Sequence, residues 1–415
     1  MNGEQSQPTC RFCGAALTTS MVDLGMSPLC ESYLRADQLN QMEPFYPLHV
    51  YACGACLLVQ LEEYVDPGEI FTEYAYFSAY SDSWLDHARR YVEGAIDRFG
   101  LGAEHLVVEV GSNDGYLLQY FVQRGIPVLG IDPAANVAEA ALARNVPTTV
   151  AFFGGTMAAQ VVDQGRRADL VVGNNVLAQV PDINDFVAGV AIVLAPSGVA
   201  TFEFPHLLRL MDENQFDTIY HEHFSYFSLL AAERIFARHD LTVFDVEELP
   251  THGGSLRLYL RHADRDDPPV AEPVGRLRER ELAAGLDAMA TYAAMEERVR
   301  GTKRALLDLL IKLKEAGHSI AAYGAAGKGN TLLNYCGIRA DFLDYVVDRN
   351  PYKQGRFLPG SHIPILHPDH IAETRPDYVL ILPWNLRDEI VSQLAYIRDW
   401  GGQFIVPIPH ADVFS

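Results

Sequence analysis

The sequence contains no apolar run long enough to span a bilayer, and its start, MNGEQSQPTC, lacks the basic and apolar segments of a signal peptide. Basic residues are scarce as well, because 32 lysines and arginines stand against 54 acidic residues, for a formal charge of −22. Such an excess repels nucleic-acid phosphates and favours solubility. We therefore expect a cytoplasmic protein with no nucleic acid or membrane partner, either monomeric or weakly homo-oligomeric.

The length of 415 residues is too great for one hydrophobic core and predicts two or three domains. Strands alternate with helical segments from HLVVEV onward and again from HSIAAYG onward, which is typical of parallel sheets with crossover helices. The runs LTVFDVEEL and GSLRLYLRH alternate with period two and suggest antiparallel additions to the first sheet. We place the domain boundaries after residues 66 and 272, the second within a proline-rich linker.

Four of the six cysteines form two CxxC pairs, CRFC and CGAC. In a cytosolic chain, paired CxxC motifs indicate a metal site rather than a disulfide framework. Four thiolates suit tetrahedral Zn²⁺, and with no open position the metal is expected to be structural. We expect Cys30 and Cys336 to be ordinary thiols that are wholly or partly buried. The expected zinc ligands are Cys10, Cys13, Cys53 and Cys56.

A glycine loop follows the first strand of the first α/β series, in VVEVGSNDGYLL. It begins with an acid and has Asn between two glycines, so it departs from the dinucleotide pattern G-x-G-x-x-G and fits the looser loop that binds S-adenosylmethionine. An acid ends the next strand, in GIDP, where ribose hydroxyls are bound. The alternative is a Rossmann turn without a cofactor. The candidate cofactor-binding residues are Glu109, Gly111, Asn113, Gly115, Asp132, Asn174 and Asn175.

The stretch YHEH lies just after the strand VATFEFP, near the carboxyl edge of the predicted sheet where ligands bind. As a metal site it is poor, because the two histidines are two residues apart rather than four. Histidine titrates near neutrality, so general acid–base catalysis is the better interpretation. Histidines satisfied by hydrogen bonds inside the core are the alternative.

A second glycine loop, GAAGKGN, follows a strand of the second series, and Asp348 ends the next strand. Its spacing is closer to the dinucleotide pattern, although Lys328 is followed by glycine, which excludes a Walker A loop. Lys328 and free amides could hold a diphosphate. A structural half-Rossmann fold with an empty loop is an equally good interpretation.

In this order, CRFCG, CGAC, VVEVGSNDGYLL, GNNVLAQVPDINDFV, YHEHFSYFSL, HGGSLRLYL and YGAAGKGNTLLNYCG resemble the S-adenosylmethionine-dependent sugar C-methyltransferases of deoxysugar and antibiotic-sugar biosynthesis, over nearly the whole chain. The resemblance implies an α/β chain with a four-cysteine zinc-binding module at 1–66, a class I methyltransferase Rossmann-like domain at 67–272 and a C-terminal Rossmann-like domain at 273–415. It also implies methylation of a carbon, commonly C3, of a nucleotide-linked, usually dTDP-linked, 4-keto-6-deoxysugar.

Carried over by motif, His223 matches the family's general base, and Tyr220 and Glu222 match its neighbours in the sugar pocket. Tyr74 or Tyr76 would also face the reacting centre. Family members often have histidine where this chain has Gln179, which cannot shuttle a proton, so we expect that residue to position substrate or water. The candidate substrate-binding residues are Gln179, His252, Ser255, Tyr323 and Lys328.

Three other functions remain open at this stage. A sugar O-methyltransferase would use the same cofactor loop and also need a base. An NAD(P)-dependent nucleotide-sugar oxidoreductase would use the second glycine loop and Asp348. A zinc-ribbon interaction module with two non-catalytic Rossmann units is the non-enzymatic alternative, although the polar YHEH cluster argues against it.

Overall fold

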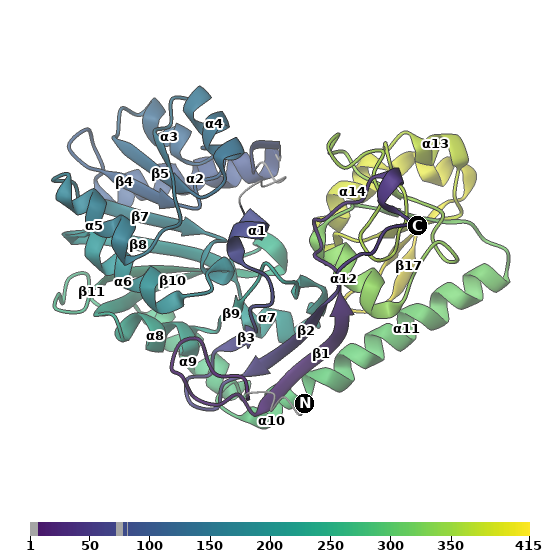
Figure 1. The fold of residues 1–415 in the computed structure, drawn as a ribbon, viewed down its shortest axis with the longest axis horizontal. Coiled ribbons are helices and arrows are strands. Elements are labelled where there is room, and N and C mark those ends of the chain that lie inside the picture. The colour runs from purple at the N-terminus through teal and green to yellow at the C-terminus, as the bar shows by residue number, and fades with distance from the viewer. Residues whose placement is uncertain (1–6, 72–77, 81) are drawn as a thin grey trace.

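The computed structural model describes residues 7–71, 78–80 and 82–415, which form three β-sheets joined by helices (Figure 1). Two of the sheets are of the parallel α/β kind that the alternating pattern predicts, and the third is a small antiparallel sheet at the N-terminus. Tyr74 and Tyr76 lie outside the described residues. None of the helices in the described part of the chain is both long and apolar enough to cross a bilayer.

The N-terminal sheet has the strand order β1-β2-β3-β9. Residues alternate between core and surface along β2, where Leu48, Val50 and Ala52 are buried, as expected for a sheet with one solvated face. The last strand comes from far along the chain and pairs antiparallel with β3. The N-terminal sheet is therefore completed by the region that carries YHEH. Its strands are β1 (Thr19–Ser27), β2 (Tyr46–Ala52), β3 (Val59–Leu61) and β9 (Ser225–Tyr226).

The second sheet has seven strands in the order β10-β11-β8-β7-β4-β5-β6, preceded by α1 (Pro67–Phe71) and α2 (Asp82–Phe99). Five strands are parallel, and β10 and β11 add antiparallel at one edge, as their period-two alternation predicts. All four residues of the central strand β4 are buried, because helices cover both faces. The strands are β4 (Val107–Val110), β5 (Val128–Asp132), β6 (Thr148–Val150), β7 (Ala168–Asn174), β8 (Leu194–Pro205), β10 (Leu241–Leu249) and β11 (Ser255–His262).

The helices of this second unit lie between its strands in the chain and cover the sheet on both sides (Figure 1). Two of them begin at side-chain caps, since Asp182 accepts from the Asp185 amide and Ser228 accepts from the Ala231 amide. The helices are α3 (Leu118–Gln123), α4 (Ala135–Ala143), α5 (Gly155–Asp163), α6 (Ile183–Val193), α7 (Leu207–Asp212) and α8 (Leu229–Ala237).

Three helices connect the two α/β units: α9 (Glu272–Ala283), α10 (Met289–Ala293) and α11 (Met295–Glu315). The longest, α11, runs beneath the N-terminal hairpin towards the C-terminal unit (Figure 1). Its buried residues Val299, Leu306 and Leu310 recur at helical spacing, and its other face is rich in charged residues.

The C-terminal sheet has the order β14-β13-β12-β15-β16-β17, in which only β17 is antiparallel. Its strands are β12 (Ile320–Tyr323), β13 (Val346–Val347), β14 (Ile365–Leu366), β15 (Tyr378–Ile381), β16 (Gln403–Val406) and β17 (Asp412–Phe414). Its helices are α12 (Gly327–Cys336), α13 (His370–Thr374) and α14 (Arg387–Gln393).

The hairpin of β1 and β2 joins the two α/β units (Figure 1). One end carries the cysteine pairs, and the loop at the other end reaches the C-terminal unit, where Leu34 and Phe357 exchange two backbone hydrogen bonds of 2.9 and 2.8 Å. A single hydrophobic cluster includes β1, β2, α11 and the C-terminal sheet. The division after residues 66 and 272 stays a prediction, because these segments share cores.

Candidate active site

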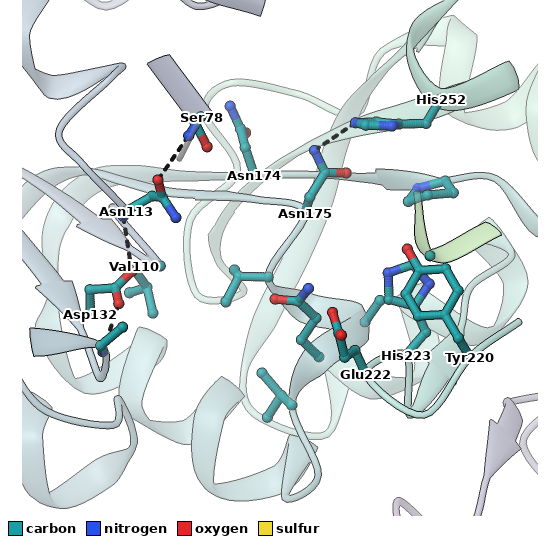
Figure 2. Close-up of a pocket in the computed structure, with 18 of the residues that line it drawn as sticks. Ser78, Val110, Asn113, Asp132, Asn174, Asn175, Tyr220, Glu222, His223 and His252 are labelled. Atoms are coloured by element: carbon teal, nitrogen blue, oxygen red, sulfur yellow. Dashed lines mark hydrogen bonds between the residues drawn. The ribbon is translucent and has the colours of Figure 1, made fainter. Parts of the chain in front are cut away.

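A cavity of about 980 Å³ lies at the carboxyl edge of the seven-stranded sheet, against the start of α12. Pockets for small molecules usually occupy roughly 300–1,000 Å³, so this cavity lies at the upper end of that range and can hold a large ligand or two smaller ones. Figure 2 shows Asp132 and Asn113 at one end and Tyr220, Glu222 and His223 at the other, with Asn175 between them. The candidate cofactor and catalytic residues therefore lie along one continuous space.

The first glycine loop turns sharply between β4 and α3. Gly111 and Gly115 have φ angles of 67° and 76°, and a Cβ on either would come within 3.0 Å of a valine side chain. Only glycine adopts this conformation in so little space without strain. Asn113, with φ 48°, accepts a hydrogen bond from the Ser78 amide at 3.0 Å. The loop therefore presents its backbone to the cavity, where Gly111 and Asn113 are lining residues.

Asp132 ends β5 and lines the cavity. Its two carboxylate oxygens accept hydrogen bonds from the amides of Asn113 and Ala134, both at 2.9 Å, which fixes the carboxylate against the loop. Burial raises its pKa, while these two bonds act in the opposite direction. Each oxygen retains a lone pair, so the residue can accept hydrogen bonds from ribose hydroxyls.

Two buried polar side chains near this loop have unused hydrogen-bonding capacity. Neither carboxylate oxygen of Glu109 and neither amide atom of Asn174 has a partner among the described residues. Burial, and then the charges of Asp132 and Asp114, raises the pKa of Glu109 well above its ordinary value. Buried polar groups are rarely left unsatisfied, and Asn174 lines the cavity, so a ligand bound there can supply its missing hydrogen-bond partners. Glu109 and Gly115 support the loop from outside the cavity lining.

His223 lies on the other side of the cavity, with its Nδ1 donating to the carbonyl oxygen of Thr218 at 3.0 Å. Thr218 ends the 3₁₀ turn η4 (Phe216–Thr218). Burial, together with the charges of His252 and Lys328 and against the opposing bond to Thr218, lowers the pKa of His223 to about 4. The ring is therefore neutral at pH 7 and keeps a basic Nε2, as a proton acceptor requires.

The other YHEH residues have different surroundings. The Tyr220 ring stacks on His223, and Glu222 accepts from the Cys30 thiol with 3.6 Å between Sγ and Oε1. Both line the cavity. His221 instead bonds through Nε2 to the Pro47 carbonyl oxygen at 3.1 Å, away from His223. The two histidines therefore form no metal site, in agreement with their spacing.

Three of the five candidate substrate-binding residues line the cavity, namely Gln179, His252 and Lys328. The other two, Ser255 and Tyr323, do not line it, and their assignment as substrate contacts stays a prediction. The Ser255 hydroxyl turns back to donate to the Thr251 carbonyl oxygen at 2.9 Å. The Tyr323 hydroxyl donates to Gln393 Oε1 at 3.0 Å. In both cases the hydroxyl donates its hydrogen bond to another part of the protein rather than to a ligand in the cavity.

His252 reaches the cavity through a strained turn, with φ 54° at a residue that has a Cβ. Positive φ angles follow at Gly253 and Gly254, where a Cβ would come within 2.5 Å of Trp384 and 2.7 Å of Arg209. Asn175 Nδ2 lies 3.3 Å from His252 Nε2. Strain of this kind persists where surrounding contacts hold it and is concentrated at functional sites.

Sequence reasoning missed a group of residues that supports this turn. Glu203 on β8 is fully buried and accepts hydrogen bonds from His87, Arg257 and Thr251. Burial alone would raise its pKa, but the bond from His87 and the charge of Arg257 hold it at about 2. These residues come from distant segments with no shared motif. The only available signal was an acid within an otherwise apolar strand.

The second glycine loop uses its polar groups internally. Asp348 accepts from the amide of Ala325 at 2.8 Å, and the carbonyl oxygen of Ala325 accepts from Tyr33 and Lys353 at 2.6 and 2.9 Å. The acid that would bind a nicotinamide cofactor's ribose is thus fixed to the loop. Lys328 lies in the same loop, and its ammonium donates a hydrogen bond to Asn385 Oδ1 at 2.8 Å.

The four cysteines of the two CxxC pairs come together, with all four Sγ atoms within 4.8 Å of one another. Cys10 and Cys56 are 3.5 Å apart at sulfur, and Cys13 and Cys53 are 3.6 Å apart. Zn–S bonds of about 2.3 Å in a tetrahedron place sulfurs roughly 3.8 Å apart, so the set fits Zn²⁺. Gln60 Nε2 donates to Cys10 Sγ at 3.1 Å and orients that ligand.

Comparisons with known proteins agree with this geometry. Residues 10–71 match a putative zinc binding domain, residues 84–246 a methyltransferase domain, and residues 250–409 a C-methyltransferase C-terminal domain. The C-methyltransferase NovU of Streptomyces niveus is 38% identical over 98% of this chain and 96% of its own.

More distant matches cover only part of the chain. A ubiquinone biosynthesis O-methyltransferase of Rhodopseudomonas palustris is 27% identical over 32% of this chain and 60% of its own. The solved magnesium protoporphyrin IX methyltransferase of Synechocystis aligns over 43% of this chain and 81% of its own, with TM-score 0.33 and 15% identity. The full-length match, together with the cofactor loop and the cysteine cluster, shows that the chain belongs to the S-adenosylmethionine-dependent, zinc-binding C-methyltransferases.

Proposed function

We propose that the enzyme methylates a carbon, C3, beside the C4 ketone of a nucleotide-linked 4-keto-6-deoxysugar, with dTDP as the nucleotide. The observation that carries the proposal is the state of His223. Its Nδ1 is committed to Thr218, its ring is neutral, and it lines the cavity together with Tyr220 and Lys328. A neutral imidazole is suited to removing a proton from carbon next to a carbonyl.

The cofactor fits the end of the cavity that holds the first glycine loop. Asp132 would accept hydrogen bonds from the ribose hydroxyls, and Asn174 and Asn175 would contact the part of the cofactor nearest the acceptor. The buried carboxylate of Glu109 would offset the cofactor's positive charge from beneath the loop. S-adenosylmethionine supplies a methyl group on a positively charged sulfur, so its transfer requires no catalytic metal.

The acceptor fits the opposite end. A proton on C3 is acidic because the carbanion that forms delocalises onto the C4 oxygen. His223 Nε2 would take that proton, and the resulting carbanion is the nucleophile. A well-placed general base typically contributes about 10²–10⁴-fold to the rate. Tyr220 would donate a hydrogen bond to the C4 oxygen as its negative charge develops.

The remaining lining residues would position the sugar and its nucleotide. Gln179 keeps a donor and an acceptor for a sugar hydroxyl or water, and Glu222 accepts from a second hydroxyl. Lys328, in the first turn of α12, and His252 would face the anionic diphosphate and the sugar. Tyr74 or Tyr76 would complete the site.

The test is to incubate the enzyme with a panel of nucleotide 4-keto-6-deoxysugars and methyl-labelled S-adenosylmethionine. We expect a labelled methyl group on carbon, detected by NMR, and solvent deuterium entering C3 when the enzyme is present. Label on a hydroxyl oxygen would instead favour the O-methyltransferase alternative. Failure of every ketosugar both to exchange and to gain a carbon–carbon bond would overturn the proposal.

A further inference from the structure

Asp217 is a buried carboxylate for which the mechanism above has no use. It lies on η4, is fully buried, and accepts a hydrogen bond from the Trp384 indole at 2.8 Å through Oδ2. Its Oδ1 has no partner among the described residues. A buried charge without a cation in direct contact is costly, so its retention calls for an explanation.

The ring of Trp384 links this carboxylate to the acceptor end of the cavity. Lys328 Nζ lies 4.8 Å from the centroid of the Trp384 ring, and the neighbouring Asn385 accepts from the same ammonium. The edge of the ring closes the space beside Gly253, next to His252. One indole therefore contacts a buried anion, a half-buried cation that lines the cavity, and the strained turn.

Electrostatics couples the two charges across this ring. Burial lowers the pKa of Lys328, and the charge of Asp217 opposes that shift. Burial raises the pKa of Asp217 to about 6, and Lys328 opposes that shift in turn. His223 and His252 also face the ammonium, which helps to keep both rings neutral. Each charge is thus retained in the interior with help from the other.

The turn η4 also connects this pair to the general base. Its Asp217 side chain reaches Trp384, while the carbonyl oxygen of the next residue holds His223. Helix α12, which carries Lys328, packs on the same turn through Thr331, whose hydroxyl donates to the Ile219 carbonyl oxygen at 3.0 Å. The lysine and the histidine are therefore positioned by one short segment.

We propose that Asp217, acting through Trp384, is a positioning residue that holds the Lys328 ammonium charged and in place for the anionic end of the acceptor. The inference rests on the proposed function only for the identity of that acceptor. Trp384 fixes the location of the ammonium, and the carboxylate compensates its charge. Asp217 itself touches neither ligand.

The first test needs no acceptor. Lys328 lines the cavity, so its acetylation by dilute acetic anhydride at pH 7, followed by mass spectrometry, reports how much neutral amine is present. Asp217→Asn should raise that reactivity measurably, because loss of the opposing charge lowers the pKa of Lys328 and increases the fraction of neutral amine. Asp212→Asn, at an exposed aspartate five residues away, is the matched control and should change nothing. Unchanged reactivity in Asp217→Asn would overturn the inference whatever the acceptor is.

The second test uses whichever acceptor the wild-type enzyme methylates. Asp217→Asn and Trp384→Phe should each raise KM for the acceptor about tenfold and leave the Kd for S-adenosylmethionine within twofold. Trp400→Phe is the control, since that indole also donates to one oxygen, the Pro376 carbonyl at 3.0 Å, outside the cavity.

The double variant separates positioning from general damage. In the Lys328→Met background, Asp217→Asn should add less than twofold to KM, because the group it positions is already gone. Fully additive effects, or an equal loss of cofactor binding, would show a merely structural role. If no ketosugar is a substrate of the wild type, the proposed function fails while the labelling result still decides this inference.

Discussion

His223 and Tyr220 stack on each other, with ring centroids 4.1 Å apart and planes inclined by 34°. One ring nitrogen is already bonded to Thr218, so the imidazole is held both at its edge and on its face. A base fixed in this way loses little conformational freedom when the acceptor binds. For the proton removal that we propose, the arrangement is preorganised before either substrate enters.

Replacement of His223 with Asn should reduce methyl transfer by about 10²–10⁴-fold, because the basic Nε2 is lost. The Kd for S-adenosylmethionine should stay within twofold, since the cofactor residues lie at the other end of the cavity. Initial rates with labelled cofactor and calorimetric titration measure the two quantities.

His221→Asn provides the matched control. It removes the bond to the Pro47 carbonyl oxygen, costing about 1 kcal/mol of stability, and should leave kcat nearly unchanged. Equal losses of turnover in the two variants would assign His223 a structural role.

The pH profile of kcat, measured with saturating acceptor so that the titration of Asp217 near pH 6 does not enter through KM, should show no transition near 6.5, the ordinary histidine pKa. Burial lowers the pKa of His223 to about 4, so the neutral base is present above that value and is lost only as pH falls through it. At high pH, kcat/KM should decline as Lys328 loses its charge. The decline should begin at a pH below the ordinary lysine pKa, because burial lowers the pKa of Lys328. Rates measured from about pH 3.5 to 9 test both limbs, and halving of kcat near 6.5 would contradict the assignment.

Glu109→Gln should stabilise the protein without cofactor and weaken cofactor binding. Burial, and then the charges of Asp132 and Asp114, raise the pKa of this carboxyl, which disfavours its ionised form when the site is empty. A bound positive charge should favour its ionised form, so S-adenosylmethionine should release a proton on binding to the wild type. Calorimetry in buffers of different ionisation enthalpy measures that proton, and the variant should release none. Proton release that persists in the variant would exclude Glu109 as its source.

Zinc loss should unfold the N-terminal module. The purified chain should hold one zinc, and Cys13→Ser should lower the zinc content and the thermal midpoint together, because structural zinc sites supply up to roughly 10–16 kcal/mol of binding energy. Cys336→Ala removes a buried thiol outside the cluster and should keep the metal. A full complement of zinc in Cys13→Ser would contradict the four-cysteine site.

The features predictable from sequence are those that depend on local rules. Three such features are the glycine loop at Gly111, the acid ending β5 and the paired cysteines. Each lies within a short segment, and its residue types and spacing alone indicate the local backbone conformation or the ligand. The antiparallel strands were predictable for the same reason, because period-two alternation reports one-sided burial. Domain boundaries were harder, since β9 leaves its own region to pair with β3.

The side-chain directions at the acceptor end were not predictable. Ser255 and Tyr323 have the right location along the chain, but their hydroxyls bond to Thr251 and Gln393 rather than to the cavity. The choice depends on whether a partner within the protein is nearer than a ligand. The pairing of Asp217 with Trp384 depends on contacts between distant segments, which no spacing reveals.

The hairpin of β1 and β2 carries metal ligands at one end and, at the other, the loop whose Cys30 contacts Glu222 and whose Tyr33 contacts Ala325. Residues 28–34 are thus encoded with the zinc module, yet Glu31 of this loop lines the cavity. Chimaeras that exchange methyltransferase halves between relatives should consequently transplant this loop as well. A recombination point placed after the second CxxC pair would combine most of the cavity from one parent with residues 28–34 from the other parent.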